Sequence, residues 1–73
     1  MSSDPVDLRQ LRIFLAAAEL KTFARAAKMI GVTPSAVSQT VATLEKDLGT
    51  ALFERDARPL RLTAAGRRLA ADG

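Results

Sequence analysis

Short polar side chains, spaced for one face of a helix, are the residues of this chain best suited to chemistry with another molecule. Ser35, Ser38, Gln39, Ala42 and Thr43 recur at intervals of three and four residues, whereas a solvated helix face usually carries Glu and Lys. An amide can bond an adenine edge, a hydroxyl can bond either kind of base, and a methyl group can contact thymine in a major groove about 12 Å wide. The pattern predicts a face that reads DNA bases. A neutral protein-interaction face has the same composition and stays an alternative.

Basic side chains occur on both sides of that segment in the sequence. The chain has 11 basic and 8 acidic residues and a net charge of +3. Basic side chains that hold phosphates position a protein on DNA, while other residues read the bases. The candidates for DNA backbone or minor-groove contacts are Lys21, Arg25, Lys28, Arg55, Arg58 and Arg61. Arg58 precedes Pro59 in a predicted turn, where it either enters a narrow A·T minor groove or stays solvated.

The missing residue types limit other functions. The chain has no Cys, His, Trp or Tyr, and so no thiolate or imidazole for catalysis or metal binding. An enzyme would have to act through carboxylates, Ser or Lys, and we predict neither an enzyme nor a cofactor or metal. The longest apolar run, 13–18, is far shorter than the roughly 20 residues of a membrane span. Because no signal-peptide pattern opens the chain, we expect a cytoplasmic protein without membrane contact.

The first of the elements that must position these residues is a helix from Asp7. Residues 1–6 are expected to form a flexible leader, because Pro5 disfavours helix before it. Asp7 is a suitable N-cap. The predicted inward stripe comprises Leu8, Leu11, Leu15 and Ala18, with Phe14 beside them.

The second and third predicted helices are separated by a very short turn. The second helix is expected at Phe23–Ile30, with Thr22 as N-cap and Gly31 as a left-handed C-cap. The third spans 33–48 and begins with Pro34, whose missing N–H costs nothing in the first turn. Its inward stripe consists of Val37, Val41, Leu44 and Leu48. Two helices joined in this way are typical of a helix–turn–helix unit, although a hairpin in a helical bundle uses the same small residues.

The pattern after Gly49 predicts a β-hairpin. Residues 52–55 and 60–62 are short enough for two strands, and 56–59 would form the turn between them. A hairpin at this position makes the unit a winged variant, with 55–61 as the wing.

Thr63 is a suitable cap for a fourth helix over 63–73, in which Gly66 should cost about 1 kcal/mol relative to Ala. The predicted fold is therefore mainly α. It is a winged helix–turn–helix domain over 7–62, with a three-helix core, a two-stranded β-hairpin wing and the start of a fourth linker helix.

Several stretches together resemble one known family. They are DLRQLRIFLAAAE at 7–19, TFARAAKMIGVTPSAVSQTVATLEKDLGTALFER at 22–55, and PLRLTAAG at 59–66. The chain is similar over almost its whole length to the N-terminal DNA-binding domain of LysR-type bacterial transcriptional regulators. Any one of these stretches would be weak evidence, but their joint spacing is specific.

The resemblance implies a set of contact residues. By match of position, Thr33, Pro34, Ser35, Ser38 and Gln39 would contact bases or the nearby backbone, and Arg55 and Arg58 would hold phosphates or enter the minor groove. Many members have Gln then Pro where this chain has Pro34 then Ser35, and often Arg in place of Gln39. These departures concern which bases are read.

The resemblance also implies partners. Family members bind double-stranded DNA and form homodimers through a long fourth helix, with tetramers possible in the full-length proteins. A C-terminal domain, which this chain does not contain, senses a small-molecule inducer. The rival hypothesis from the residues is a winged helix that binds only proteins, but that function has no need for the basic residues Lys21, Arg25, Lys28 and Arg58 together.

Overall fold

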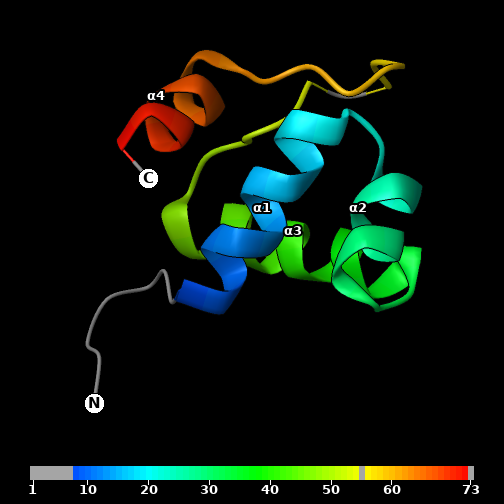
Figure 1. Cartoon of the computed structure of the whole chain (residues 1–73). Helices are drawn as coiled ribbons and strands as arrows, with labels where there is room; N and C mark the ends of the chain where they lie inside the picture. The colour runs from blue at the N-terminus through cyan, green and yellow to red at the C-terminus, as the bar shows by residue number, and fades with distance from the viewer. Residues whose placement is uncertain (1–7, 55, 73) are drawn as a thin grey trace.

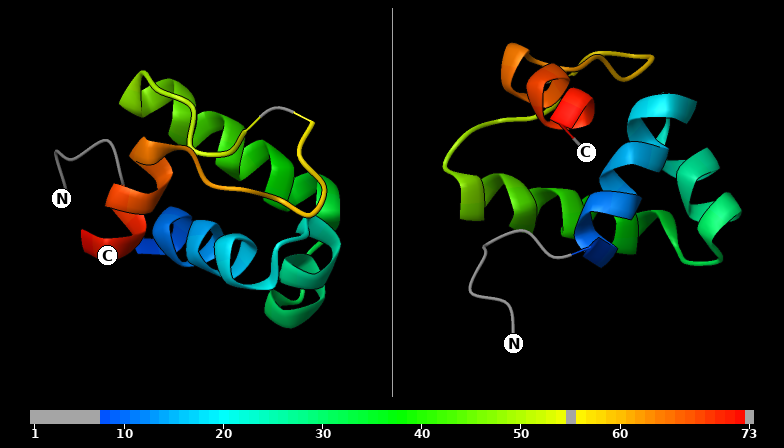
Figure 2. Two further views of the ribbon diagram at one scale, coloured as in Figure 1. Left: turned by 90° about the horizontal axis from the view of Figure 1, so that it is seen from above. Right: turned by 60° about the vertical axis from the view of Figure 1, so that its left-hand side comes forward.

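The computed structural model describes residues 8–54 and 56–72, and this part of the chain contains four helices. In order, they are α1 (Leu8–Leu20), α2 (Phe23–Ile30), α3 (Pro34–Leu48) and α4 (Ala64–Asp72). Helix α1 lies across α3, α2 packs against both, and the connection after α3 doubles back above α1 before α4 begins (Figures 1 and 2). The predicted leader and the predicted N-cap at Asp7 lie outside the described residues.

The bounds of α2 and α3 are fixed by local hydrogen bonds at their ends. The Thr22 hydroxyl oxygen accepts the Arg25 amide at 3.0 Å, and the Thr33 hydroxyl oxygen accepts the Ala36 amide at 3.1 Å. Gly31 closes α2 with a φ of 90°, a left-handed conformation that glycine adopts without strain. The predicted positions of both helices are confirmed.

Small side chains let the three core helices approach closely. Ala17, Ala26 and Ala27 are almost completely buried, and Phe14 and Leu44 fill the space around them. The inward stripe predicted for α3 is confirmed, since Val37, Val41 and Leu44 are buried and Leu48 packs against the core. The three-helix core therefore rests on close packing of alanines around a few large residues.

The inward face predicted for α1 is confirmed in part. Phe14 is buried, and Leu11, Leu15 and Ala18 pack against the core. Leu8 is 72% exposed, so its place in the stripe is wrong. The buried residues of α1 are Ile13, Phe14, Ala16 and Ala17. Because α1 packs against both α2 and α3, its buried surface is centred between these two contacts, and the predicted stripe lies along one border of it.

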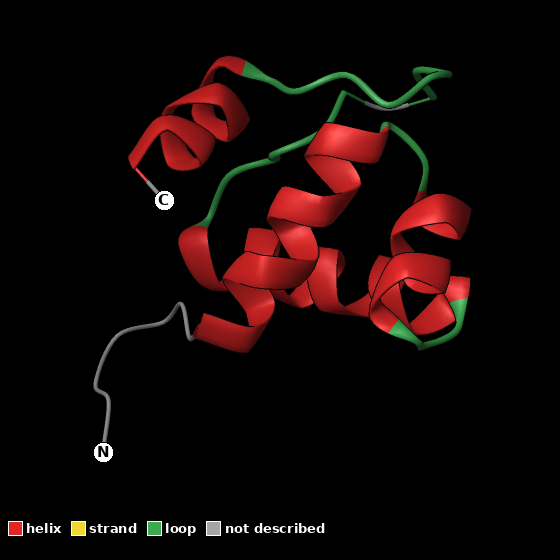
Figure 3. Ribbon diagram, viewed as in Figure 1, coloured by secondary structure: helices red, strands yellow, loops and turns green. Residues whose placement is uncertain are grey.

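The predicted two-stranded hairpin is not present as strands. Within the described residues the connection between α3 and α4 is drawn as loop throughout (Figure 3), and a single antiparallel bridge joins Phe53 and Leu62. Two backbone hydrogen bonds flank that bridge, from the Glu54 amide to the Arg61 carbonyl at 2.8 Å and from the Thr63 amide to the Leu52 carbonyl at 3.0 Å.

Other amides of the loop bond to the helices instead of to a ladder. The Leu52 and Phe53 amides donate to the Glu45 carboxylate of α3. The Leu60 amide donates to the Lys21 carbonyl at 2.9 Å. The ring of Phe53 also packs against Phe14 and Phe23, with centroid distances of 5.5 and 5.9 Å. Helix contacts therefore replace the cross-strand pairing that the alternating sequence predicted.

Helix α4 begins at its predicted cap. The Thr63 hydroxyl accepts the Gly66 amide at 3.0 Å and donates to the Ala51 carbonyl at 2.6 Å. Gly66 is buried, and a Cβ placed on it would overlap the carbonyl oxygen of Leu52. The expectation that Ala would suit this position better is wrong, because the close approach of two backbones leaves no room for a methyl group.

We expect Gly66→Ala to destabilise the chain by about 1–3 kcal/mol, the range for overpacking a closely packed site. Helix propensity alone predicts the opposite, a gain of about 1 kcal/mol. Chemical denaturation followed by circular dichroism separates the two. Ala64→Gly, at an exposed position of the same helix, is the matched control and should lose only the propensity difference. A more stable Gly66→Ala variant would contradict the observed approach of α4 to Leu52.

Candidate nucleic-acid interface

The outward face of α3 carries the residues predicted to read bases. Thr33, Pro34, Ser35, Ser38 and Gln39 are all exposed at the start of this helix. Ala42 and Thr43 continue the exposed face one turn further along. We refer to Ser35, Ser38, Gln39, Ala42 and Thr43 as the α3 ridge. The ridge is uncharged, and the opposite side of α3 is anchored in the core.

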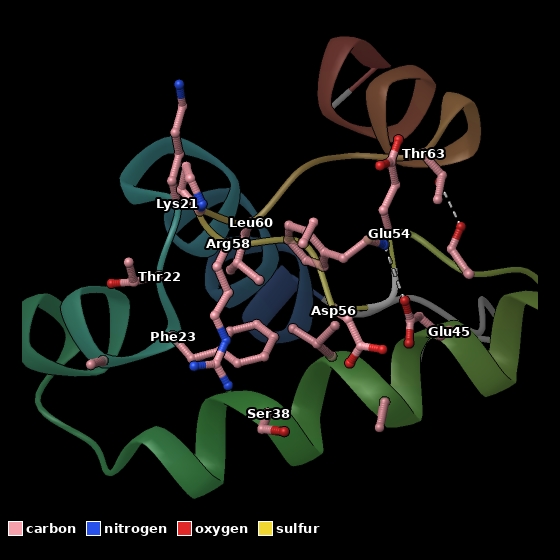
Figure 4. Close-up of a pocket in the computed structure, with 17 residues that line it drawn as sticks. Lys21, Thr22, Phe23, Ser38, Glu45, Glu54, Asp56, Arg58, Leu60 and Thr63 are labelled. Carbon is pink, nitrogen blue, oxygen red and sulfur yellow. Dashed lines mark hydrogen bonds between the residues drawn. The ribbon is translucent and has the colours of Figure 1, made fainter.

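A groove lies on each side of the α3 ridge. The first, the loop groove, lies between α3, the start of α2 and the loop 51–63, and Ser38 and Ala42 line it (Figure 4). The second, the α1 groove, lies between α3 and α1, and Gln39 and Thr43 line it. Ser38 and Gln39 are adjacent in sequence but border different grooves. The α3 ridge is therefore accessible from both sides.

The loop groove brings together charged residues from three parts of the chain. Lys21 comes from the junction of α1 and α2, Arg58 comes from the loop, and both line this groove. In Figure 4 the Arg58 side chain extends from the loop toward α3 and Ser38. The carboxylates of Glu45, Glu54 and Asp56 also line the groove. Its wall is thus mixed in charge. The Arg58 guanidinium lies over α3, whereas the Lys21 side chain extends away from it (Figure 4).

The loop lies close to α2 because it is hydrogen-bonded to Lys21, whose backbone conformation is strained. Lys21 has a φ of 64°, in the left-handed region that non-glycine residues rarely adopt. In this conformation its carbonyl oxygen accepts the Leu60 amide. This bond holds the loop against the α1–α2 junction and places Arg58 near the start of α2.

The other residues predicted to contact the DNA backbone are less closely grouped. Arg25 and Lys28 are exposed on α2 and lie outside both grooves. The Arg61 guanidinium lies 3.8 Å from the Glu54 carboxylate, and both side chains are well exposed, so this pair is weak. Arg55 lies outside the described residues.

Two residues of this region, Arg9 and Glu45, were not predicted from the sequence. Arg9 is exposed at the start of α1 and lines the α1 groove opposite Gln39 and Thr43. The sequence pattern does not reveal this position, because the crossing of α1 over α3 is a tertiary feature. Glu45 has no distinguishing spacing in the sequence, and its role is visible only from the amides it holds.

The described part of the chain has neither a metal-binding cluster nor a membrane-spanning helix. Residues 8–54 and 56–72 contain no group of three or more His, Cys, Asp or Glu side chains placed to hold a metal ion. None of the helices described is both long enough and apolar enough to span a membrane.

Comparison with known proteins identifies the family. The family described as "Bacterial regulatory helix-turn-helix protein, lysR family" matches residues 8–67. The chain belongs to the lysR family. The resemblance drawn from the sequence motifs is thereby confirmed.

Relatives and solved structures agree with this assignment. The LysR-family chain is 52% identical over 62 residues to "Uncharacterized HTH-type transcriptional regulator y4mQ" of Sinorhizobium fredii, covering 85% of the chain and 21% of that protein. It is 47% identical over 64 residues to the HTH-type transcriptional activator IlvY of Salmonella typhimurium, covering 88% of the chain and 22% of that protein. The chain therefore spans about a fifth of these relatives.

A solved structure described as a complex of BenM_DBD with benA site 1 DNA matches the LysR-family fold with a TM-score of 0.90 at 33% identity. The match covers 92% of this chain and 75% of that one. The mainly helical architecture of the LysR-family chain is thus that of a DNA-binding domain solved on DNA.

Proposed function

We propose that this LysR-family chain binds double-stranded DNA sequence-specifically as part of a transcriptional regulator. The α3 ridge enters the major groove, and the loop 55–61 acts as the wing on the DNA backbone or minor groove. The observation that carries the proposal is the exposed, uncharged α3 ridge with basic side chains in the grooves on both sides. A helix of this kind can approach base edges, while the flanking cations meet phosphates.

In this proposal the first two turns of α3 read the bases. Thr33, Pro34, Ser35, Ser38 and Gln39 lie exposed at the N-terminal end of the helix, the end that contacts base edges in helix–turn–helix proteins. Gln39 has the amide that can bond adenine in a bidentate manner, and the serine hydroxyls accept either kind of base.

The phosphate contacts are assigned to the cations around the ridge. They are Lys21, Arg25, Lys28, Arg55, Arg58 and Arg61, with Arg9 added from the structure. Arg58 flanks α3 on the side of the loop groove, whose far end is lined by Lys21, and Arg9 flanks α3 on the side of the α1 groove. Cations on both sides of the ridge suit the two DNA backbones that border a major groove.

The rest of the regulator is proposed from the family resemblance. The chain spans about a fifth of the length of its relatives, and we assign inducer sensing to a C-terminal effector domain in the remainder of such a protein. Homodimerisation is assigned to a continuation of α4, with tetramers in the full-length protein. The function is regulatory, not enzymatic, because the relatives are named as transcriptional regulators. It would be carried out in the cytoplasm, where a bacterial chromosome lies.

A salt titration of duplex binding tests the proposal. Fluorescence anisotropy with a labelled duplex should give a logarithm of affinity that falls linearly with the logarithm of salt concentration, with a slope of about −3.6 if four phosphates are neutralised. Absence of duplex binding at low salt would instead favour a domain that binds only proteins.

We expect Arg58→Ala to weaken duplex binding about five- to tenfold near 0.1 M salt and to reduce the salt slope by about 1, the contribution of one phosphate contact. Asp56→Asn is the matched control in the same loop. It removes a negative charge at a position with a φ of 61° that Asn also adopts, so affinity should be kept or raised. An unchanged slope for Arg58→Ala would mean that Arg58 is merely solvated at the turn.

A further inference from the structure

The Glu45 carboxylate holds the loop to α3 through two backbone amides. Its Oε2 atom accepts the Leu52 amide at 2.7 Å and the Phe53 amide at 3.2 Å. Hydrogen bonds from neutral donors to a carboxylate are shorter and stronger than those between neutral groups. Glu45 is only partly exposed, so solvent competes less for these bonds than at an open surface.

The position of Glu45 has a cost for the helix itself. It lies in the last turn of α3, Pro34–Leu48, where the negative end of the helix dipole disfavours a carboxylate. A negative charge also lines the groove where the proposed DNA backbone would pass. Neither helix stability nor attraction to DNA explains an acidic residue here. The hydrogen bonds that Glu45 accepts from the two loop amides explain it.

These two bonds matter because the loop has almost no β-ladder to direct it. One antiparallel bridge joins its two legs at Phe53 and Leu62 in the described residues. The loop is also attached by the bond from the Leu60 amide to the Lys21 carbonyl, by the Phe53 ring, and by Leu52, which is buried in the core. Glu45 fixes the leg that leaves α3, and Lys21 fixes the leg that returns from Arg58.

We propose that Glu45 is a positioning residue that sets the distance between the α3 ridge and Arg58, so that both engage one duplex; this rests on the function proposed above. Glu45 itself contacts no DNA. It acts through the Leu52 and Phe53 amides, which orient the loop that carries Arg58. Without those bonds the first leg is still held by the buried Leu52 and Phe53 side chains and by hydrogen bonds to the returning leg, but its Leu52 and Phe53 amides lose their acceptor on α3.

The test is a double-mutant cycle between Glu45 and Arg58 in the 73-residue chain. Glu45→Leu removes the acceptor with a side chain of similar bulk, and Glu45→Gln keeps an oxygen that can accept the same amides. Asp47→Asn removes an exposed carboxylate from the same turn of α3 and controls for charge. Electrostatics alone predicts tighter DNA binding when either carboxylate is removed, whereas positioning predicts weaker binding for Glu45→Leu only.

If Glu45 positions the loop, Arg58→Ala weakens binding about five- to tenfold in the wild-type background. In the Glu45→Leu background, Arg58→Ala then weakens DNA binding less than about twofold. In the Glu45→Gln background, Arg58→Ala weakens binding nearly as much as in the wild type. An equal cost of Arg58→Ala in both backgrounds would overturn the proposal, and so would wild-type or tighter binding by Glu45→Leu.

A second measurement needs no DNA. Heteronuclear NOEs of the loop amides at 56–58, 60 and 61 in the free chain should fall in Glu45→Leu, while those of α2 and α3 stay at wild-type values. Unchanged loop values would reject the positioning role even if affinity is lost. If Arg58→Ala alone leaves affinity unchanged, the proposed DNA contact fails, and the NOE comparison still decides whether Glu45 orders the loop.

Discussion

Replacing Gln39 with alanine is expected to lower affinity for the best operator sequence by about 1–3 kcal/mol, or about 5- to 150-fold. Gln39 is exposed on the α3 ridge and faces the α1 groove, so its amide is free to meet a base edge without moving the core. Affinity for random duplex should barely change, because phosphate contacts supply non-specific binding. Binding measured against a panel of single-base variants should show relaxed preference at one base pair.

Thr43→Ala is the matched control for this prediction. Thr43 lies on the same groove and the same helix face one turn further from the N-terminus of α3, beyond the part of a recognition helix that usually reads bases. Thr43→Ala should lower affinity for the specific site much less than Gln39→Ala does. Equal losses on specific and random duplex for Gln39→Ala would remove Gln39 from base reading.

The 73-residue chain is expected to self-associate only weakly. The larger side chains around α4, Leu62 and Leu69, already pack against the core of their own chain, together with Ala65 and Ala70. What α4 leaves exposed includes the small side chains of Ala64 and Ala71. This surface is far below the roughly 1,200 Å² that stable interfaces bury. Sedimentation at micromolar concentration should therefore find mostly monomer.

Joining two copies should then raise operator affinity by orders of magnitude. Fusion of α4 to a dimeric coiled coil brings a second reading helix to a half-site about one helical turn, or a multiple of it, away. The gain expected from effective concentration is about 10²–10⁴-fold on a duplex with two half-sites. The control is the same fusion protein on a duplex with a single half-site, where affinity should rise only a little. A 73-residue dimer that survives dilution would show that this chain is sufficient for dimerisation.

The caps and the outer face of α3 could be read from the sequence because they depend on neighbours along the chain. Thr22 and Thr33 bond to amides three residues ahead, and Gly31 adopts a φ that few other residues allow. The exposed face of α3 follows from the helical period once its buried stripe of Val37 and Leu44 is recognised. These are local properties, so they can be predicted without knowledge of the fold.

Contacts between distant segments decided the rest. The buried face of α1 was predicted only in part, because the burial of Ile13, Ala16 and Ala17 depends on how α1 crosses α2 and α3. The prediction that Ala would suit position 66 better than Gly failed because only the fold brings the Leu52 carbonyl against Gly66. The alternation at 60–62 predicted a strand, but the fold offers the loop amides a carboxylate on α3 and a carbonyl at Lys21 instead.

The sequence by itself thus determined the helix–turn–helix unit and the uncharged face that we propose reads DNA, since hydrogen bonds over three or four residues and helical periodicity define both. The tertiary structure alone decided where the loop lies against that face. A loop with one bridge takes its direction from partners far away in the sequence, here Glu45 and Lys21. Their identity depends on the packing of all three core helices.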